Sequence, residues 1–346
     1  MKRTILLLAL LSTAALTAQE QAPENDSIRQ SDLRADLFFL ASDAMQGRLA
    51  DTPENRLAAE FIKSRFERMG LTPAGPNGSF YHQYNLMTAS LAEGNELLIA
   101  SGTGESQRSL RLRQDYYPLN FSASGQARGD VVFAGFGIVS PERGHDDYSS
   151  GSVDGKVVVV LNHEPGERDP ESVFDGLVTS HASGAIRKAV YAQEHGAAAL
   201  LIVTDAHNHP GPGNFQAQAR GTWPAEPRRV PRYTLSAWMD EVRIPVAQIS
   251  PAVAEALVGG SGYTLDELGA MAEADGGVAP IPLVGQRIEL GTAVDRRVVP
   301  DRNVVGMVEG SDPDLADEVI IICAHYDHNG ADGTRVFAGA DDDGSG

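Results

Sequence analysis

The stretch that decides the fold reads AHYDHNG at residues 324–330 and GADDDGSG at residues 339–346. The apolar run before it predicts a buried strand over 318–323, and side chains alternate along a strand, so His325 and Asp327 would lie on one side of the chain. His325 can then face a metal ion while Asp327 holds the other ring nitrogen and fixes the tautomer. The aspartate-rich loop supplies oxygen donors, and one carboxylate can bridge two cations. Together the two motifs predict half of a two-metal hydrolytic site.

The aspartate-rich loop has other interpretations when taken alone. Residues 341–344 also fit an acidic turn or a calcium loop, because Asp-x-Asp-Gly opens an oxygen-ligand cage. The nearby His325 favours zinc, which accepts nitrogen ligands. His328, on the turn before Asn329, is interpreted as a loop-bonding or solvent-facing side chain rather than a ligand.

Composition excludes several classes of protein and of site. The chain has 346 residues, enough for two domains and room for a third. It carries 28 Lys and Arg against 47 Asp and Glu, a net charge of −19, which predicts no nucleic-acid partner. The single cysteine, Cys323, allows no intramolecular disulfide and no multi-cysteine centre, so a metal must be held by histidine and carboxylate. Its apolar neighbours predict that Cys323 is buried.

Residues 1–18 predict a secretory signal peptide. Lys2 and Arg3 precede an apolar run that ends near Leu16, and Ala18 offers a small residue for cleavage. The run is too short to span a bilayer. We therefore expect an exported protein, periplasmic or extracellular, with no membrane attachment after cleavage.

Two amphipathic helices are predicted to open the mature chain. The first runs over 31–40 with Ser31 as its N-cap. The second begins at Thr52 and Pro53 and ends at Gly70. A strand is expected over 96–101.

The middle of the chain, residues 126–280, predicts a small β-rich domain inserted into another. Strands are expected over 130–136, 156–161, 199–203 and 244–249, with one clear helix over 185–195. A Pro- and Gly-rich loop over 204–229 carries His207 and His209, a weak candidate metal site for which an exposed polar loop is the preferred interpretation.

The stretch from Asn303 to Gly346 closely resembles the co-catalytic di-zinc aminopeptidase family. Residues 31–90, including Gly47-Arg48, are similar to that family's N-terminal lead-in, and the middle segment resembles the protease-associated domain that many exported members carry. The resemblance implies an α/β fold: an incomplete three-layer αβα zinc-exopeptidase domain with the small β-rich insertion. The expected parts are a signal peptide (1–18), a first peptidase segment (19–125), the protease-associated insertion (126–280) and the first metal-ligand segment (281–346).

The resemblance also implies roles for single residues. His325 would be a ligand of one zinc ion and Asp342 the carboxylate that bridges two, with Asp327 orienting His325. A non-proline cis peptide would follow Asp342. The implied enzyme is an exported zinc aminopeptidase that uses two Zn²⁺ ions and a metal-activated water to remove N-terminal residues from peptides with a free N-terminus.

The family's remaining ligands and its general base lie downstream of the aspartate-rich loop, and this sequence stops at Gly346. We therefore expect a fragment of a longer reading frame that is inactive alone, binds zinc weakly and exposes an apolar patch. A dipeptidase, a carboxypeptidase or a glutaminyl cyclase of the same fold stays open as an alternative. A non-catalytic peptide-binding module is the alternative from another class.

Overall fold

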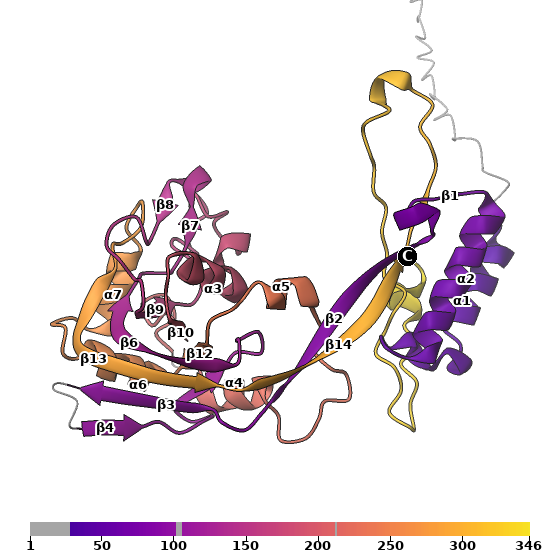
Figure 1. The fold of residues 1–346 in the computed structure, drawn as a ribbon. Coiled ribbons are helices and arrows are strands. Elements are labelled where there is room, and N and C mark those ends of the chain that lie inside the picture. The colour runs from indigo at the N-terminus through magenta and orange to yellow at the C-terminus, as the bar shows by residue number, and fades with distance from the viewer. Residues whose placement is uncertain (1–27, 102–105, 212) are drawn as a thin grey trace, which may run out of the picture.

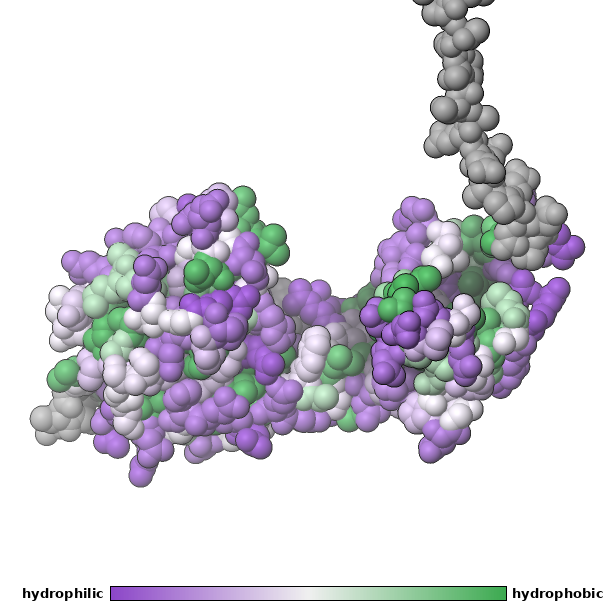
Figure 2. All heavy atoms as spheres, turned by 90° about the horizontal axis from the view of Figure 1, so that it is seen from above, coloured by the Kyte–Doolittle hydropathy of each residue, from purple (hydrophilic) through white to green (hydrophobic). Residues whose placement is uncertain are grey.

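The chain forms two bodies joined by a long two-stranded ribbon (Figure 1). The computed structural model describes residues 28–101, 106–211 and 213–346, so the predicted signal peptide lies outside the described residues. The ribbon pairs β2 (Tyr81–Leu91) with β14 (Val294–Val304) in antiparallel register along their whole length. Seen from above, the two bodies are separate masses with a narrower connection between them (Figure 2).

The larger body is built on an eight-stranded sheet of order β4-β3-β13-β6-β9-β10-β12-β5. Four neighbouring strands, β6, β9, β10 and β12, are parallel, and the outer strands pair antiparallel. In sheet order the strands are Ser106–Ser109, Glu96–Ser101, Ile281–Thr292, Gly125–Phe133, Val157–Leu161, Ala199–Val203, Val246–Ile249 and Tyr116–Pro118. The sheet therefore extends beyond residues 126–280 on both sides.

Helices cover both faces of this sheet. Val157, Val159 and Leu161 of β9 join a core with α6 (Pro251–Val258) and α7 (Leu265–Ala272). The alternate residues Val158 and Val160 join a second core with α3 (Ala185–Glu194) and α5 (Ser236–Asp240). A strand buried on both faces is apolar throughout, which is why β9 and β10 are legible in the sequence. The predicted α/β class is confirmed.

The smaller body contains α1 (Gln30–Leu40), η1 (Asp43–Arg48) and α2 (Pro53–Met69). The predicted limits of α2 are confirmed: Thr52 accepts from the Asn55 backbone N–H at 3.2 Å, and Gly70 ends the helix with φ of 77°. The predicted N-cap of α1 is wrong. The helix begins one residue earlier, and the Ser31 hydroxyl lies 3.5 Å from the Asp32 carboxylate.

The remaining elements are short. β11 (Thr234–Leu235) extends the β2–β14 sheet, β1 (Thr72–Pro73) pairs with β15 (Gly306–Met307), and β7 (Val139–Ser140) pairs with β8 (His145–Asp146). The others are α4 (Phe215–Thr222), η2 (Pro76–Gly78), η3 (Pro141–Arg143), η4 (His181–Ser183), η5 (Pro313–Leu315) and η6 (Ala340–Gly344). The described part of residues 126–280 thus holds five α-helices where the sequence showed one clearly, because α4 to α7 have only five to eight residues and give weak periodicity. None of the described helices has the length and hydropathy needed to cross a membrane.

One predicted strand does not form. Residues 318–323 belong to no strand or helix, since no strand among the described residues pairs with them. Ile320, Ile321 and Ile322 are 92%, 81% and 95% exposed, and Cys323 is exposed instead of buried. The expected apolar patch is therefore present.

Candidate metal centre

The two motifs singled out in the sequence meet at His325 and Asp342. The imidazole Nε2 of His325 lies 3.0 Å from Oδ1 of Asp342. On the other side of the ring, Nδ1 lies 3.0 Å from the backbone carbonyl oxygen of Asp327, which can only accept, so Nδ1 carries a proton. With Nδ1 protonated, the Nε2 lone pair is the one free to bind a metal ion, and the 3.0 Å contact with Asp342 is a hydrogen bond only when Nε2 carries a proton as well.

The contact with Asp327 differs in one detail from the expected one. Its carboxylate oxygen is 3.5 Å from Nδ1, farther than the carbonyl oxygen, so the main chain makes the closer contact with the ring. This hydrogen bond raises the pKa of His325 above its ordinary value, and the charges of Asp327 and Asp342 raise it further, while partial burial lowers it. Both carboxylates thus favour positive charge at the ring.

The aspartate-rich loop is bent around this contact. The peptide bond between Asp342 and Asp343 is cis, as the family resemblance predicts. The Asp343 carboxylate accepts from the backbone N–H of His325 at 3.3 Å. Nδ1 of His328 is 3.7 Å from the second Asp342 oxygen, so His328 faces the loop and not open solvent. At Gly339, with φ of 57°, a Cβ would lie 2.5 Å from the His328 ring, so a side chain has no room there.

Arg48, to which the sequence analysis gave no role, holds the segments around Tyr326 and Gly339 through hydrogen bonds. Its side chain is fully buried, and its guanidinium donates to four backbone carbonyls. One belongs to Leu40 at the end of α1. The others belong to Tyr326, at 2.6 Å, and to Ala338 and Gly339, at 2.8 Å each. A single cation therefore joins the lead-in helix to both motifs. The Gly47-Arg48 pair, within residues 31–90 that resemble the family's N-terminal segment, is the sequence signal that could have indicated this role.

Gly47 lets these segments approach. It has φ of 67°, and a Cβ there would lie 2.4 Å from the Phe337 carbonyl oxygen and 2.5 Å from that of Gly330. Its own carbonyl accepts from the Gly330 N–H at 3.1 Å. Glycine is required by both the backbone angle and the space.

His325 and Asp342 are ligands of the types that zinc prefers, but they are fewer than a zinc ion needs. Zinc binds imidazole nitrogen and carboxylate oxygen, with three or four protein ligands in most sites. His325 and Asp342 supply one of each, and both side chains are at least half exposed. Among the residues that the structure describes, no third His, Cys, Asp or Glu completes a ligand group here; the one such group lies in the larger body, at His163, Glu167 and His209.

One known family model covers the segment that holds both motifs. The sequence model of Peptidase family M28 matches residues 303–346. No curated protein matches the chain. Among solved structures, the chain is similar to an aminopeptidase from Aneurinibacillus sp. strain AM-1 (14% identity, 91% of this chain and 55% of that one, TM-score 0.41). A second is BSAP, a zinc aminopeptidase from Bacillus subtilis (15% identity, 91% and 54% of the chains, TM-score 0.27).

The chain thus spans about half the length of these two structures. The family match begins within β14 and ends with the aspartate-rich loop, so it contains both His325 and Asp342. Residues 303–346 are therefore similar to Peptidase family M28.

Proposed function

We propose that the protein is an exported zinc-dependent aminopeptidase that removes N-terminal residues from peptides with a free N-terminus. The observation that carries the proposal is the 3.0 Å approach of His325 Nε2 to Asp342 Oδ1 inside the segment that matches Peptidase family M28. The signal-like sequence at residues 1–18 supports export.

In this proposal each residue has a distinct task. His325 donates the Nε2 lone pair to one zinc ion. Asp342 would hold the metal through its carboxylate oxygens and could be shared between two ions. Asp327 is a positioning residue that keeps the proton on Nδ1 of His325. When bound, zinc supplies Lewis-acid activation of water and of the peptide carbonyl.

Two donors hold an ion weakly, because affinity for zinc comes from three or four ligands acting together. We therefore propose that residues 28–346 alone bind zinc loosely at this centre and do not turn over peptide. The exposed faces of His325 and Asp342 are where further ligands would approach.

We also propose the division into a peptidase part and an inserted protease-associated domain. The two bodies in Figure 1 support a division of this kind. The large sheet also contains β3 and β13, which supports wider limits for the inserted domain than residues 126–280.

The test is zinc content together with hydrolysis of an aminoacyl-anilide panel, measured on the full reading frame that contains this chain. We expect two zinc ions per chain and cleavage confined to substrates with a free amino group. His325→Ala and Asp342→Ala should each remove bound zinc and lower kcat/KM at least a hundredfold, since each deletes a ligand (on the order of 10²-fold). His181→Ala, an exposed histidine of the larger body, is the matched control and should change neither.

Unchanged turnover in either ligand variant would end the assignment of these residues. Cleavage of N-acetylated anilides would instead point to a peptidase that needs no free N-terminus, and cleavage only of peptides with a free C-terminal carboxylate would point to a carboxypeptidase. One zinc ion or none, with no cleavage, would favour a cyclase or a non-catalytic module.

A further inference from the structure

The larger body contains a second group of metal-ligand type, formed by His163, Glu167 and His209. One donor atom from each lies within 4.8 Å of the other two. The Glu167 carboxylate contacts both rings: one oxygen is 3.0 Å from His163 Nδ1 and the other is 2.5 Å from His209 Nε2. The two imidazole rings stack with their centroids 4.3 Å apart.

The position of this group in the fold is one that favours ligand binding. His163 follows β9 by two residues, and His209 lies in the loop after β10, the adjacent parallel strand. The hydrogen bond from the Asn162 N–H to the Val203 carbonyl, 2.7 Å long, keeps the ends of these strands together. In open α/β sheets, ligands bind in the crevice outside the carboxyl ends of the strands.

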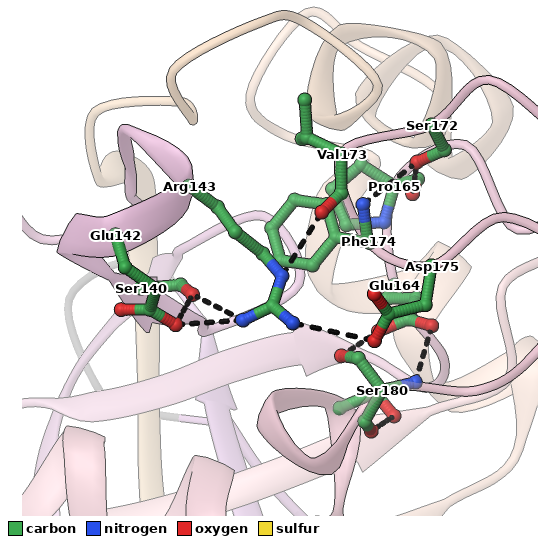
Figure 3. Close-up of polar contacts among 11 residues, drawn as sticks. Ser140, Glu142, Arg143, Glu164, Pro165, Ser172, Val173, Phe174, Asp175 and Ser180 are labelled. Atoms are coloured by element: carbon green, nitrogen blue, oxygen red, sulfur yellow. Dashed lines mark hydrogen bonds and ion pairs between the residues drawn. The ribbon is translucent and has the colours of Figure 1, made fainter.

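The segment that carries His163 and Glu167 is fixed at several points. The buried Lys188 ammonium donates to the carbonyls of Leu161 and His163 at 2.8 and 2.6 Å. Glu164, also buried, accepts from both the backbone N–H and the hydroxyl of Ser180 (Figure 3). His163 has φ of 67°, a backbone state rare for a residue with a side chain, and these contacts hold it there.

Arg143 fixes the far end of the same segment. Its guanidinium donates to the Val173 carbonyl at 2.9 Å and to the Asp175 carboxylate at 3.2 Å (Figure 3). It also lies over the ring of Phe174, 5.8 Å from the centroid.

The loop that carries His209 is tied to the first segment. Asp205, fully buried, accepts from the backbone N–H of His207 at 3.0 Å and from the Asn208 amide at 2.8 Å. Glu273 then accepts from Asn208 at 2.5 Å and from the Gly166 N–H at 2.7 Å. One carboxylate thus links the two loops beside the His–Glu–His group.

Two atoms of the group lack a hydrogen bond. Oε1 of Glu167 and Nε2 of His209 are both buried, and neither makes a hydrogen bond of acceptable geometry to a described residue, although they face each other. Buried polar atoms of this kind call for an explanation, of which a bound ion is one. A cation between the carboxylate and the two imidazoles would satisfy both.

The group also has an open side. A cavity of about 370 Å³ is lined by both histidines and by Tyr117, Asn162, Thr204 and Gln248. An ion held by three protein ligands keeps a coordination position for water or another small donor, and the cavity provides the space for it.

We propose that His163, Glu167 and His209 bind one divalent transition-metal ion, for which Zn²⁺ is the best match, at a site separate from the M28 segment. Two imidazole nitrogens and one carboxylate suit zinc, whereas Ca²⁺ and Mg²⁺ prefer oxygen alone. Ligand atoms around zinc lie about 3.4 Å apart, so binding requires the Glu167 and His209 side chains to separate slightly. The site does not depend on the proposed peptidase function.

The experiment is titration calorimetry of Zn²⁺ into the chelator-treated 346-residue chain carrying His325→Ala, which removes the other candidate ligand. We expect one zinc ion per chain. Glu167→Gln and His209→Asn should each weaken binding at least tenfold. The matched control is His207→Asn, two residues away, whose exposed ring contacts Asp266 and not the group; its affinity should be unchanged.

Circular dichroism identifies any variant that fails to fold, and His163→Asn then takes its place. Visible absorption of bound Co²⁺ gives a second readout, with the intense bands of tetrahedral coordination expected in His325→Ala and lost in Glu167→Gln. No zinc binding by His325→Ala, or equal affinity in a folded Glu167→Gln variant, would overturn the proposal.

Discussion

At the residue scale, Arg48 holds in place the two chain segments that carry the candidate ligands His325 and Asp342. Burial lowers the pKa of its guanidinium, and the charge of Asp327 raises it, but an arginine stays charged in proteins. Its four acceptors are all backbone carbonyls, so the contact specifies chain path and not side-chain identity. The distance of His325 from Asp342 depends on that path.

Arg48→Met tests this role. The change leaves several buried carbonyls without a donor, at about 1–3 kcal/mol each, so we expect a loss of a few kcal/mol in the free energy of unfolding of the smaller body. Backbone hydrogen exchange over residues 325–344 should accelerate, and the melting temperature of the protein should fall. Arg56→Met is the control, because Arg56 is half exposed and lies 3.9 Å from Asp51, a surface pair worth about 0–1 kcal/mol. Equal effects of the two changes would contradict the argument.

Lys188 leads to a prediction on pH. Its ammonium is fully buried, and burial lowers its pKa to about 7, against the pull of Asp147 and Glu164. In the unfolded chain a lysine titrates near about 10.4, so between these values the unfolded state binds more protons. Stability must then rise with pH across this window.

We expect the free energy of unfolding to increase from pH 7 to pH 9 by up to about 2–3 kcal/mol through this group, since one pKa unit corresponds to about 1.4 kcal/mol. Urea unfolding of the parent chain and of Lys188→Met at several pH values measures it. In Lys188→Met, the free energy of unfolding should rise less steeply with pH, because this group no longer titrates. Identical slopes would mean that Lys188 keeps its proton when folded.

At the element scale, local sequence predicted those elements whose determinants are local. The bounds of α2 follow from Thr52, Pro53 and Gly70, and β10 was predicted residue for residue because its five apolar residues are buried on both faces. The strand over 318–323 has equally strong apolar character and yet does not form. A strand exists only through its partner, and the described residues offer none.

The same reasoning explains which site residues the sequence predicted. His325 and Asp342 lie in two dense motifs that are close in sequence. The motifs predicted that the two would lie close together, and the family resemblance implied the choice of Asp342 and the cis bond after it. The His–Glu–His group draws on two loops that only the pairing of β9 with β10 brings together. The available signal is a histidine after each of two neighbouring parallel strands. The sequence analysis paired His209 with His207, which contacts Asp266 instead, and gave His163 no role.

At the scale of the whole molecule, the two bodies have different internal support. The large body encloses two cores on the two faces of its sheet. Among the described residues, the smaller one has a small core cluster of Leu40, Met45 and Ala58, with Phe61 and Tyr326 packed against it. Its stability therefore depends more on buried polar contacts such as those of Arg48, and on the β2–β14 ribbon that ends beside it.

The exposed apolar segment, residues 319–322, belongs to this smaller body, and its side chains are almost fully open to solvent. Ile320, Ile321 and Ile322 are consecutive and are 92%, 81% and 95% exposed, whereas the apolar residues common on surfaces are isolated ones. We expect the 346-residue chain to bind an apolar fluorescent dye and to self-associate as concentration rises. Replacing both residues, Ile320→Lys with Ile322→Lys, should remove most of the dye signal and the association. Val284→Lys, which changes a single exposed valine of β13, should remove neither. If the parent chain binds no dye and stays monomeric in sedimentation, this segment is covered in solution, and the expectation that it is an open apolar surface is wrong.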